Sequence, residues 1–213
     1  MNQEQMASLV AKRVMTKLAD LSRYLVPVGV SARHVHVTNE VFAILFGPDA
    51  VMTKKVDVKQ PGQFAANEQV AVVGPKGQFD RVRILGPARK FNQIEVSKTD
   101  CFKLGIPPMI RLSGNIAGTP GVKLIGPKGE VELKEGCIVA MRHVHMLPEQ
   151  AEQLGLKDGE IVDIETFGDR CGVFGDVVMR VNAASALEIH IDTDEANALS
   201  LKDNDLVLIR KQR

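Results

Sequence analysis

The four-residue motif Arg-His-Val-His occurs twice in this chain, as Arg33-His34-Val35-His36 and again as Arg142-His143-Val144-His145. These two copies contain four of the five histidines in the 213 residues. In a β-strand, residues i and i+2 point to the same face, so each copy presents two imidazoles about 6–7 Å apart along the strand. Imidazole is a common zinc ligand, and the repetition predicts two metal ions or one shared site.

A third ligand is predicted downstream of each pair. Glu95 and His190 each lie between two apolar β-branched residues, in stretches that indicate strands. A Thr-Asp pair follows each of them: Thr99-Asp100 begins four residues after Glu95, and Thr193-Asp194 begins three residues after His190. The two stretches are therefore interpreted as equivalent. The two predicted ligand sets are His34, His36 and Glu95, and His143, His145 and His190. Three nitrogen or oxygen ligands with a vacant position are typical of catalytic zinc. Hydrogen-bonded core histidines are the alternative, which suits a single histidine better than a doubled set.

Composition restricts the class of protein. A formal net charge of +1 argues against a bulk electrostatic interaction with nucleic acid. No apolar run approaches the ~20 residues needed to span a bilayer, so no membrane partner is expected. Lys12, Arg13 and Lys17 would interrupt the apolar core of a secretory signal. These features predict a soluble intracellular protein.

The three cysteines are Cys101, Cys137 and Cys171. An odd, widely spaced set without a Cys-x-x-Cys motif argues against a disulfide framework and suits a reducing compartment. Cys137 lies in an apolar run, which indicates a small buried side chain. Cys101 follows the Thr-Asp pair and is harder to exclude as a nucleophile, but we favour a structural role for all three cysteines. None of the three is therefore an evident nucleophile.

Residues 1–22 show apolar side chains at helical spacing, with charged side chains on the remaining face. The apolar stripe consists of Met6, Leu9, Val10, Val14, Leu18 and Leu21. This pattern predicts an amphipathic helix that ends before Pro27. The helix either packs on its own domain or docks its apolar stripe in a groove of a partner.

After Pro27 the chain has the pattern of short strands separated by glycine and proline turns. Strands are predicted at residues 70–73, 82–85, 122–125, 138–141, 161–164, 177–181 and 206–209. Short helices are predicted at 39–46, with Thr38 as the N-cap, and at 148–154, with Pro148 in the first turn. Many short strands favour a barrel or sandwich, and the doubled motifs favour two such units.

Both histidine pairs also fit the pattern His-x-His-x3-Glu, which includes Glu40 and Glu149. This resembles the first motif of cupins and would make the two glutamates metal ligands. The helical interpretation is preferred, because each glutamate falls in the first turn of a predicted helix, where a carboxylate suits the helix dipole. The first copy also lacks the later histidine that a cupin needs.

From about residue 26 to residue 204, the chain resembles the PduL-type phosphate propanoyltransferases, the phosphotransacylases of bacterial microcompartments. The matching segments are Val28-Gly29-Val30-Ser31-Ala32-Arg33-His34-Val35-His36, Val73-Gly74-Pro75-Lys76-Gly77, Leu85-Gly86-Pro87 with Arg89, Ser113-Gly114-Asn115, Arg142-His143-Val144-His145-Met146, and residues 188–197. The resemblance implies a mainly β fold of two small β-barrels with short helical caps, preceded by the N-terminal amphipathic helix. One barrel would be discontinuous, comprising 23–32 and 141–213, and the other would comprise 33–140.

The resemblance also implies a reaction: acyl-CoA (propanoyl-CoA or acetyl-CoA) and phosphate give acyl phosphate and CoA, reversibly. It implies two zinc ions per chain in one cleft, with ligands at the two predicted triads. The soft CoA thiolate would suit the open position of the His34/His36/Glu95 zinc. The other zinc would polarise the carbonyl or orient phosphate as a Lewis acid.

An isolated arginine near a turn would by default be a solvated surface residue, but the resemblance implies that Arg89 is the catalytic and phosphate-binding residue. Its planar guanidinium can contact phosphate with two hydrogen bonds, and it follows a Gly-Pro turn where the backbone can approach the site. The resemblance further implies contacts to CoA from Val28, Gly29, Val30, Lys76, Arg83 and Asn197.

The setting is also implied by resemblance. Family members that work inside microcompartments carry an amphipathic N-terminal extension as an encapsulation peptide. Residues 1–22 would thus bind shell or core proteins. The chain would then lie in a bacterial microcompartment for propanediol degradation; without such binding it would lie in the cytoplasm. A homo-oligomer is expected.

Two other functions remain possible from the residues alone. A zinc hydrolase would use zinc-bound water and would need neither CoA nor phosphate. A metal-stabilised interaction module would close both metal sites with a fourth ligand and dock through residues 1–22. Amidohydrolases also carry His-x-His, but on a TIM barrel of about 250 residues, for which this chain is short.

Overall fold

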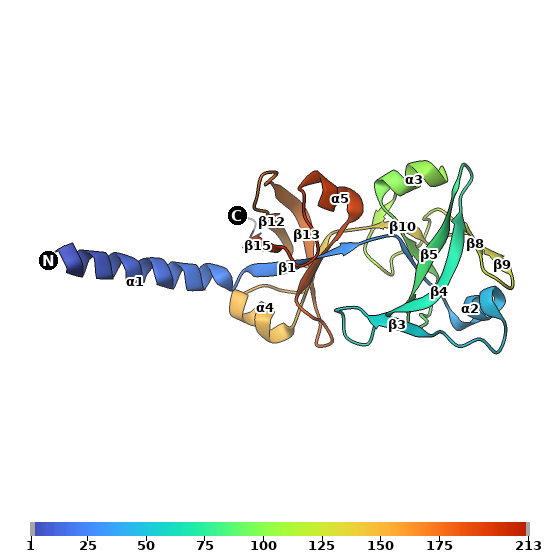
Figure 1. Cartoon of the computed structure of the whole chain (residues 1–213), viewed down its shortest axis with the longest axis horizontal. Coiled ribbons are helices and arrows are strands. Elements are labelled where there is room, and N and C mark those ends of the chain that lie inside the picture. Colours follow the sequence, from blue (N-terminus) through green and yellow to red (C-terminus); the bar gives the residue numbers. More distant parts are fainter. Residues whose placement is uncertain (1–2, 212–213) are drawn as a thin grey trace.

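The computed structural model describes residues 3–211, in which two sheets and five helices form a mainly β molecule (Figure 1). The predicted fold class is confirmed. Residues 1–2 of the predicted helix, and residues 212–213 at the other end, lie outside the described residues. Within residues 3–211, no helix is long and apolar enough to cross a membrane.

One sheet is a closed six-stranded barrel. Its strands, in spatial order, are β1 (Leu25–Ser31), β14 (Glu188–Asp192), β11 (His143–Met146), β13 (Val173–Val181), β12 (Ile161–Glu165) and β15 (Leu206–Lys211). Strand β1 pairs in parallel with β14 and antiparallel with β15. The first strand of the chain therefore closes a barrel that otherwise consists of the C-terminal third. Alternate side chains such as Val28, Ile164 and Ile189 fill its interior.

The other sheet has nine strands and curls into a half-barrel. Its strands, in spatial order, are β7 (Ile110–Arg111), β10 (Cys137–Ala140), β6 (Gln93–Glu95), β2 (His34–His36), β5 (Gln78–Gly86), β4 (Phe64–Val73), β8 (Lys123–Ile125) and β9 (Glu130–Glu132), with β3 (Lys54–Asp57) paired to β4. Its core includes Ile84, Ile94 and Leu124. All seven strand segments predicted from sequence overlap an observed strand.

Four short helices cap the sheets. Helices α2 (Asn39–Phe46) and α4 (Pro148–Leu154) begin and end as predicted. Thr38 Oγ1 accepts a hydrogen bond from Val41 N at 3.3 Å, which confirms the predicted N-cap. Glu40 and Glu149 are exposed in the first turns of these helices, away from the histidines, which argues against the cupin alternative. Helices α3 (Lys98–Leu104) and α5 (Thr193–Ala198) were not predicted.

Two equivalent glycine turns hold the half-barrel against α2 and α3. Gly74 packs on the C-terminal end of α3, where an added Cβ would lie 2.3 Å from Leu104 O. Gly126 packs in the same way on α2, where an added Cβ would lie 2.4 Å from Leu45 O. Any side chain at either position would collide with backbone, so the two Gly-Pro-Lys-Gly turns need glycine for close packing.

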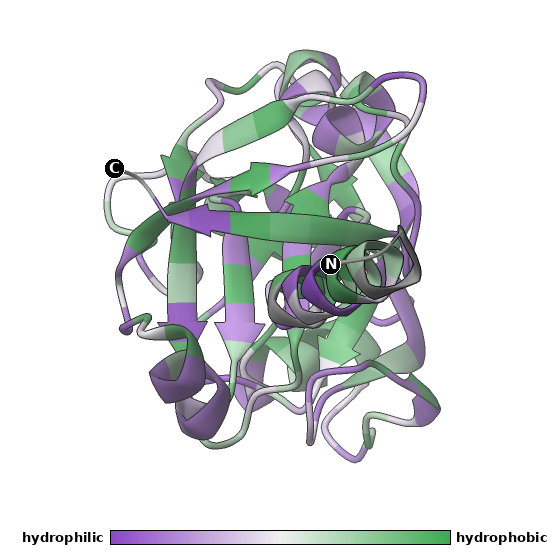
Figure 2. Cartoon of the chain, turned by 90° about the vertical axis from the view of Figure 1, so that its left-hand side faces the viewer, coloured by the Kyte–Doolittle hydropathy of each residue, from purple (hydrophilic) through white to green (hydrophobic). Residues whose placement is uncertain are grey.

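Helix α1 (Gln3–Ser22) projects away from both sheets (Figure 1). Figure 2 views the molecule from the side of this helix and shows apolar and polar residues along it. Its six apolar stripe residues are 40% to 54% exposed. Of the two interpretations left open by sequence, packing on its own domain is therefore wrong for this structure.

Candidate active site

The two predicted triads are assembled in the same way in the two sheets. In the half-barrel, β2 lies antiparallel to β6, and His34 is paired with Glu95. In the closed barrel, β11 lies antiparallel to β14, and His143 is paired with His190. Each triad therefore consists of a His-x-His strand and the residue paired with its first histidine.

The ligand atoms of each triad lie within 4.8 Å of one another. The distance is 3.5 Å between His34 Nε2 and Glu95 Oε2, and 3.1 Å between the Nε2 atoms of His143 and His145. Two ligands placed tetrahedrally about one zinc ion are about 3.3 Å apart. Both donor sets therefore fit a zinc ion in chemistry and in spacing.

The backbone selects the tautomer of three of the histidines. Nδ1 of His34, His36 and His143 donates to a backbone carbonyl. The acceptors are Ala32, Leu85 and Met141, at 2.9, 3.1 and 2.8 Å. With Nδ1 protonated, Nε2 keeps its lone pair and can bind a cation.

Burial keeps most of these imidazoles neutral. It lowers the pKa of His36 to about 3 and that of His143 to about 4, and neighbouring histidines add to both shifts. Burial likewise lowers the pKa of His145 to about 3. At His34, burial acts in the same direction, but the Glu95 carboxylate outweighs it and raises the pKa. Neutral imidazole is the form that binds metal, so the site is prepared for an ion at neutral pH.

These shifts predict that acid destabilises the metal-free protein. For three histidines the folded-state pKa lies below the unfolded value of 6.5. Their stabilising contribution is thus present above pH 6.5 and is lost as the pH falls toward 4, because only the unfolded state then binds protons. His34 and Glu195, whose pKa burial raises to about 7, act in the opposite direction but are two groups against three. Urea unfolding of the chelated protein at pH 7.5, 6.5 and 5.5 should show a falling free energy of unfolding.

The His36→Asn variant serves as the control for this prediction, because it removes one of the three groups. Its free energy of unfolding should depend less steeply on pH. A flat profile for the unmodified chain would contradict the prediction.

The second histidine of each motif also has an equivalent partner on the neighbouring strand. His36 is paired with Gln93, and His145 is paired with Glu188. Gln93 Nε2 donates to Glu95 Oε1 at 2.6 Å, and His190 Nε2 donates to Glu188 Oε2 at 2.7 Å. Each triad thus has one buried neighbour that hydrogen-bonds to its third residue. The Gln93 amide donates to the Glu95 carboxylate, and the Glu188 carboxylate accepts from the His190 imidazole.

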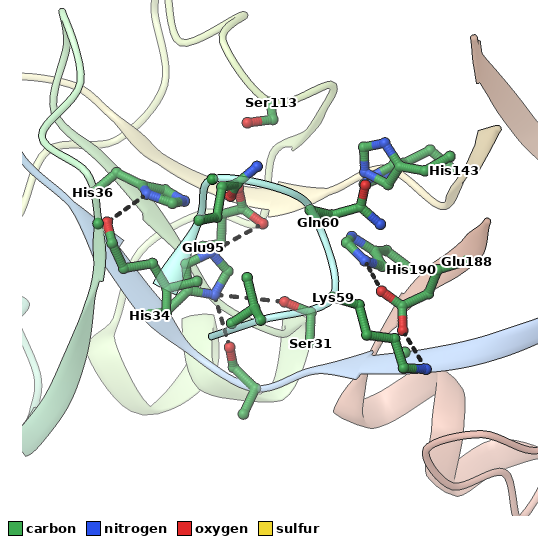
Figure 3. Close-up of a pocket in the computed structure, with 18 of the residues that line it drawn as sticks. Ser31, His34, His36, Lys59, Gln60, Glu95, Ser113, His143, Glu188 and His190 are labelled. Carbon is green, nitrogen blue, oxygen red and sulfur yellow. Dashed lines mark hydrogen bonds and ion pairs between the residues drawn. The ribbon is translucent and has the colours of Figure 1, made fainter. Parts of the chain in front are cut away.

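The triads face one cleft of about 1110 Å³, which is lined by residues of both sheets. Figure 3 shows His34, His36 and Glu95 on one side and His143 and His190 on the other. A cleft of this size can take a large ligand. The fold therefore brings residues from opposite halves of the chain to one site.

Arg89 lies in this cleft. Its guanidinium donates to Ser113 Oγ at 3.3 Å and to Gln63 Oε1 at 3.4 Å. Ser113 also accepts from Gln93 Nε2 at 2.8 Å, so hydrogen bonds connect Arg89 through Ser113 and Gln93 to Glu95 of the first triad. Both partners of Arg89 are neutral, and its positive charge remains available to an anion. Gln63 was not singled out by sequence, and Ser113 appeared only as part of a motif.

Three of the six predicted CoA contacts line the cleft, and three do not. Gly29, Val30 and Arg83 line the cleft. Val28 is fully buried in the barrel core, because side chains alternate along β1. The remaining two are exposed away from the cleft lining: Lys76 in the turn beside α3, and Asn197 in α5. The CoA assignment as a whole stays a prediction.

The loop at residues 58–63 joins the two sheets across the cleft (Figure 3). The Gln60 side-chain amide makes two hydrogen bonds to the backbone of Ala186, at 3.0 and 3.1 Å. Lys59 Nζ lies 2.8 Å from Glu188 Oε1. Sequence gave no signal for these contacts, which depend on the approach of two segments more than 120 residues apart.

The first residue of each Arg-His-Val-His motif holds a helix. Arg33 makes two hydrogen bonds to Asp100, and Arg142 pairs with Glu195 at 3.0 Å. Asp100 and Glu195 each occupy the third position of a capping box and lie five residues after the third ligand. The structural counterpart of Asp100 is therefore Glu195, one residue beyond the Thr-Asp pair noted in the sequence.

The cysteines lie away from the chemistry. Cys101 and Cys137 are buried, and Cys171 is exposed. Burial raises the pKa of Cys101 to about 11, which keeps it a thiol at neutral pH. No cysteine lines the cleft. The buried positions of Cys101 and Cys137 agree with the expected structural role, which stays a prediction for the exposed Cys171.

Fold and site together define a class: a pair of β units that deliver similar histidine-rich triads to one shared cleft. The model of the phosphate propanoyltransferase family matches residues 27–202. The chain is 50% identical over 194 residues to the phosphate propanoyltransferase of Rhodopseudomonas palustris, covering 91% of this chain and 86% of that protein. It is 46% identical to that of Thermotoga maritima over 207 residues, covering 94% and 99%.

A third relative, the phosphate propanoyltransferase of Salmonella typhimurium, is 44% identical over 191 residues, covering 89% of this chain and 90% of that protein. The chain therefore belongs to the phosphate propanoyltransferase family. Membership supports a transferase with phosphotransacylase activity, as the sequence predicted.

Proposed function

We propose that this chain catalyses the reversible reaction of acyl-CoA with phosphate to give acyl phosphate and CoA, at two zinc-binding triads in one cleft. The observation that carries the proposal is the convergence of both triads and Arg89 on a single cavity. The reaction needs an anion site beside an electrophilic site, and this cavity offers both.

The residues present fit two zinc ions. His34, His36 and Glu95 would hold one, and His143, His145 and His190 the other, with three nitrogen or oxygen donors each. Bound zinc would supply Lewis acidity toward the thioester carbonyl and a soft partner for the departing thiolate.

The other side chains bind and orient the substrates. Arg89 would hold phosphate, because its guanidinium is fixed by Ser113 and Gln63 and has no carboxylate partner in residues 3–211. Gly29 and Arg83 would line the path of CoA. A phosphate oxygen then attacks the thioester carbon, the carbon–sulfur bond breaks, and its electron pair leaves with the sulfur of CoA.

The test is phosphate-dependent release of free thiol from acetyl-CoA and propanoyl-CoA by the purified chain. Release should be lost after chelation and restored by zinc. Release that is indifferent to phosphate would instead identify a zinc hydrolase. No release from a zinc-loaded sample would favour a metal-stabilised interaction module. Either result would reject the proposed transfer.

If the second triad binds zinc, Glu188→Ala should weaken that site alone. The substitution removes the acceptor that orients His190, and loss of such a partner typically lowers metal affinity about 10- to 100-fold. Competition with a chromophoric chelator should show one weakened site and one unchanged site. The matched control is Glu152→Ala on the exposed face of α4. Equal weakening of both sites would contradict the prediction.

We also propose that the two sheets form two domains, comprising 23–32 with 141–213, and 33–140. Residues 1–22 would act as an encapsulation peptide that binds shell or core proteins of a microcompartment, and the enzyme would work as a homo-oligomer. The exposed apolar stripe of α1 supports this role, since such a face is buried when it docks on a partner.

Removal of residues 1–22 should leave the rate of thiol release within about twofold, because the stripe does not pack on the sheets. The same segment fused to a fluorescent protein should direct it to microcompartments. Leu9→Glu with Leu18→Glu should abolish this targeting, and the control Lys12→Gln with Lys17→Gln should not. Unchanged targeting by the glutamate variant would contradict the role.

A further inference from the structure

Arg180 lies beside the second triad and was not singled out by the sequence. Strands β11 and β13 run in parallel, and His145 is paired with Arg180. Paired residues on neighbouring strands project to the same face of a sheet. Both His145 and Arg180 accordingly line the cleft between the sheets.

The guanidinium of Arg180 lacks a counter-charge. Among residues 3–211, no carboxylate or other acceptor lies within hydrogen-bonding or ion-pair distance of it, whereas Arg33 in the same cleft is held by Asp100. A partly buried cation without a partner is unfavourable, and a bound anion would relieve that cost.

Arg180 acts on the same region of the cleft as Arg89. Burial lowers the pKa of Arg89, the Glu95 carboxylate opposes this shift, and the charge of Arg180 adds to it. The charge of Arg180 also contributes to the lowered pKa values of His143 and His145. Two like charges from different sheets thus face one space, which an anion of charge −2 would stabilise.

We propose that Arg180 is a second phosphate-binding residue, which together with Arg89 holds the phosphoryl group between the two sheets. The proposal rests on the proposed transfer reaction. One arginine follows β5 of the half-barrel and the other lies on β13 of the barrel, so phosphate would bridge the sheets. This position lies beside both triads, where a phosphate oxygen can reach the thioester carbon.

The experiment compares Arg180→Gln and Arg180→Lys with the control Arg81→Gln, an exposed arginine on β5 outside the cleft. KM is measured for phosphate and acyl-CoA, and in reverse for acyl phosphate and CoA. We expect Arg180→Gln to raise KM for phosphate and acyl phosphate about 10- to 100-fold, the typical effect of losing a charged hydrogen bond. KM for acyl-CoA and CoA should stay within about twofold. Arg180→Lys should lie between, because lysine keeps the charge but not the planar fork.

If the glutamine variant folds poorly, a second measurement tests the proposal without it. This is the increase in melting temperature of zinc-loaded protein on addition of inorganic phosphate. This increase should be reduced for Arg180→Lys and retained for Arg81→Gln. Raised KM for acyl-CoA with unchanged KM for phosphate would overturn the proposal and assign Arg180 to CoA. Unchanged constants for all substrates would also overturn it. If the unmodified chain shows no phosphate-dependent release, the transfer reaction itself fails, which is a different result.

Discussion

We expect replacement of His143 by alanine to lower phosphate-dependent thiol release by at least about a thousandfold, and to lower the metal content of the purified protein by about one ion per chain. Loss of a Lewis acid costs several kcal/mol in the transition state, and each 1.36 kcal/mol is tenfold in rate. His34→Ala should give the same result through the other triad. Thiol release is measured with saturating substrates, and metal content by elemental analysis.

The controls for these variants are Glu40→Ala and Glu149→Ala. Both glutamates would be metal ligands in a cupin, but here they are exposed in the first turns of α2 and α4. Their removal should leave metal content and activity unchanged. Full activity of His143→Ala, or loss of metal from Glu149→Ala, would contradict the assignment of the triads.

Replacing Arg89 by alanine should lower kcat/KM for phosphate by about 100- to 1000-fold. The side chain is fixed in the cleft by Ser113 and Gln63, and its removal takes away one of the two positive charges proposed to hold phosphate. Metal content should not change, because Arg89 is not a ligand. Initial rates at varied phosphate and fixed acyl-CoA measure the effect.

Arg89→Lys should recover only part of this loss, because an ammonium group offers a point charge instead of two parallel donors. The exposed neighbour Lys90 provides the control, and Lys90→Ala should behave as the unmodified chain. An Arg89→Ala variant that is slower with acyl-CoA but has an unchanged KM for phosphate would reject Arg89 as the phosphate-binding residue.

Much of the local structure follows from short-range patterns. The limits of α2 and α4 were predictable, since a Thr N-cap and a first-turn proline are local signals. Helices α3 and α5 were missed, although each begins with a capping box. They have only seven and six residues, so their apolar periodicity is too short to detect, and neither begins with a proline such as Pro148, which marked the equally short α4.

The sequence by itself predicted the members of each triad: a period of two along a strand places both histidines on one face, and the apolar strand after each motif indicates the third residue. It also indicated the family, which is confirmed, and through that resemblance it predicted a role for Arg89. Tertiary structure alone decided which residues surround them. Gln93 and Glu188 are neighbours of the triads through strand register, and Lys59 and Arg180 reach the cleft from segments far apart in the chain. Such contacts depend on how two sheets approach each other, and no local periodicity encodes that approach.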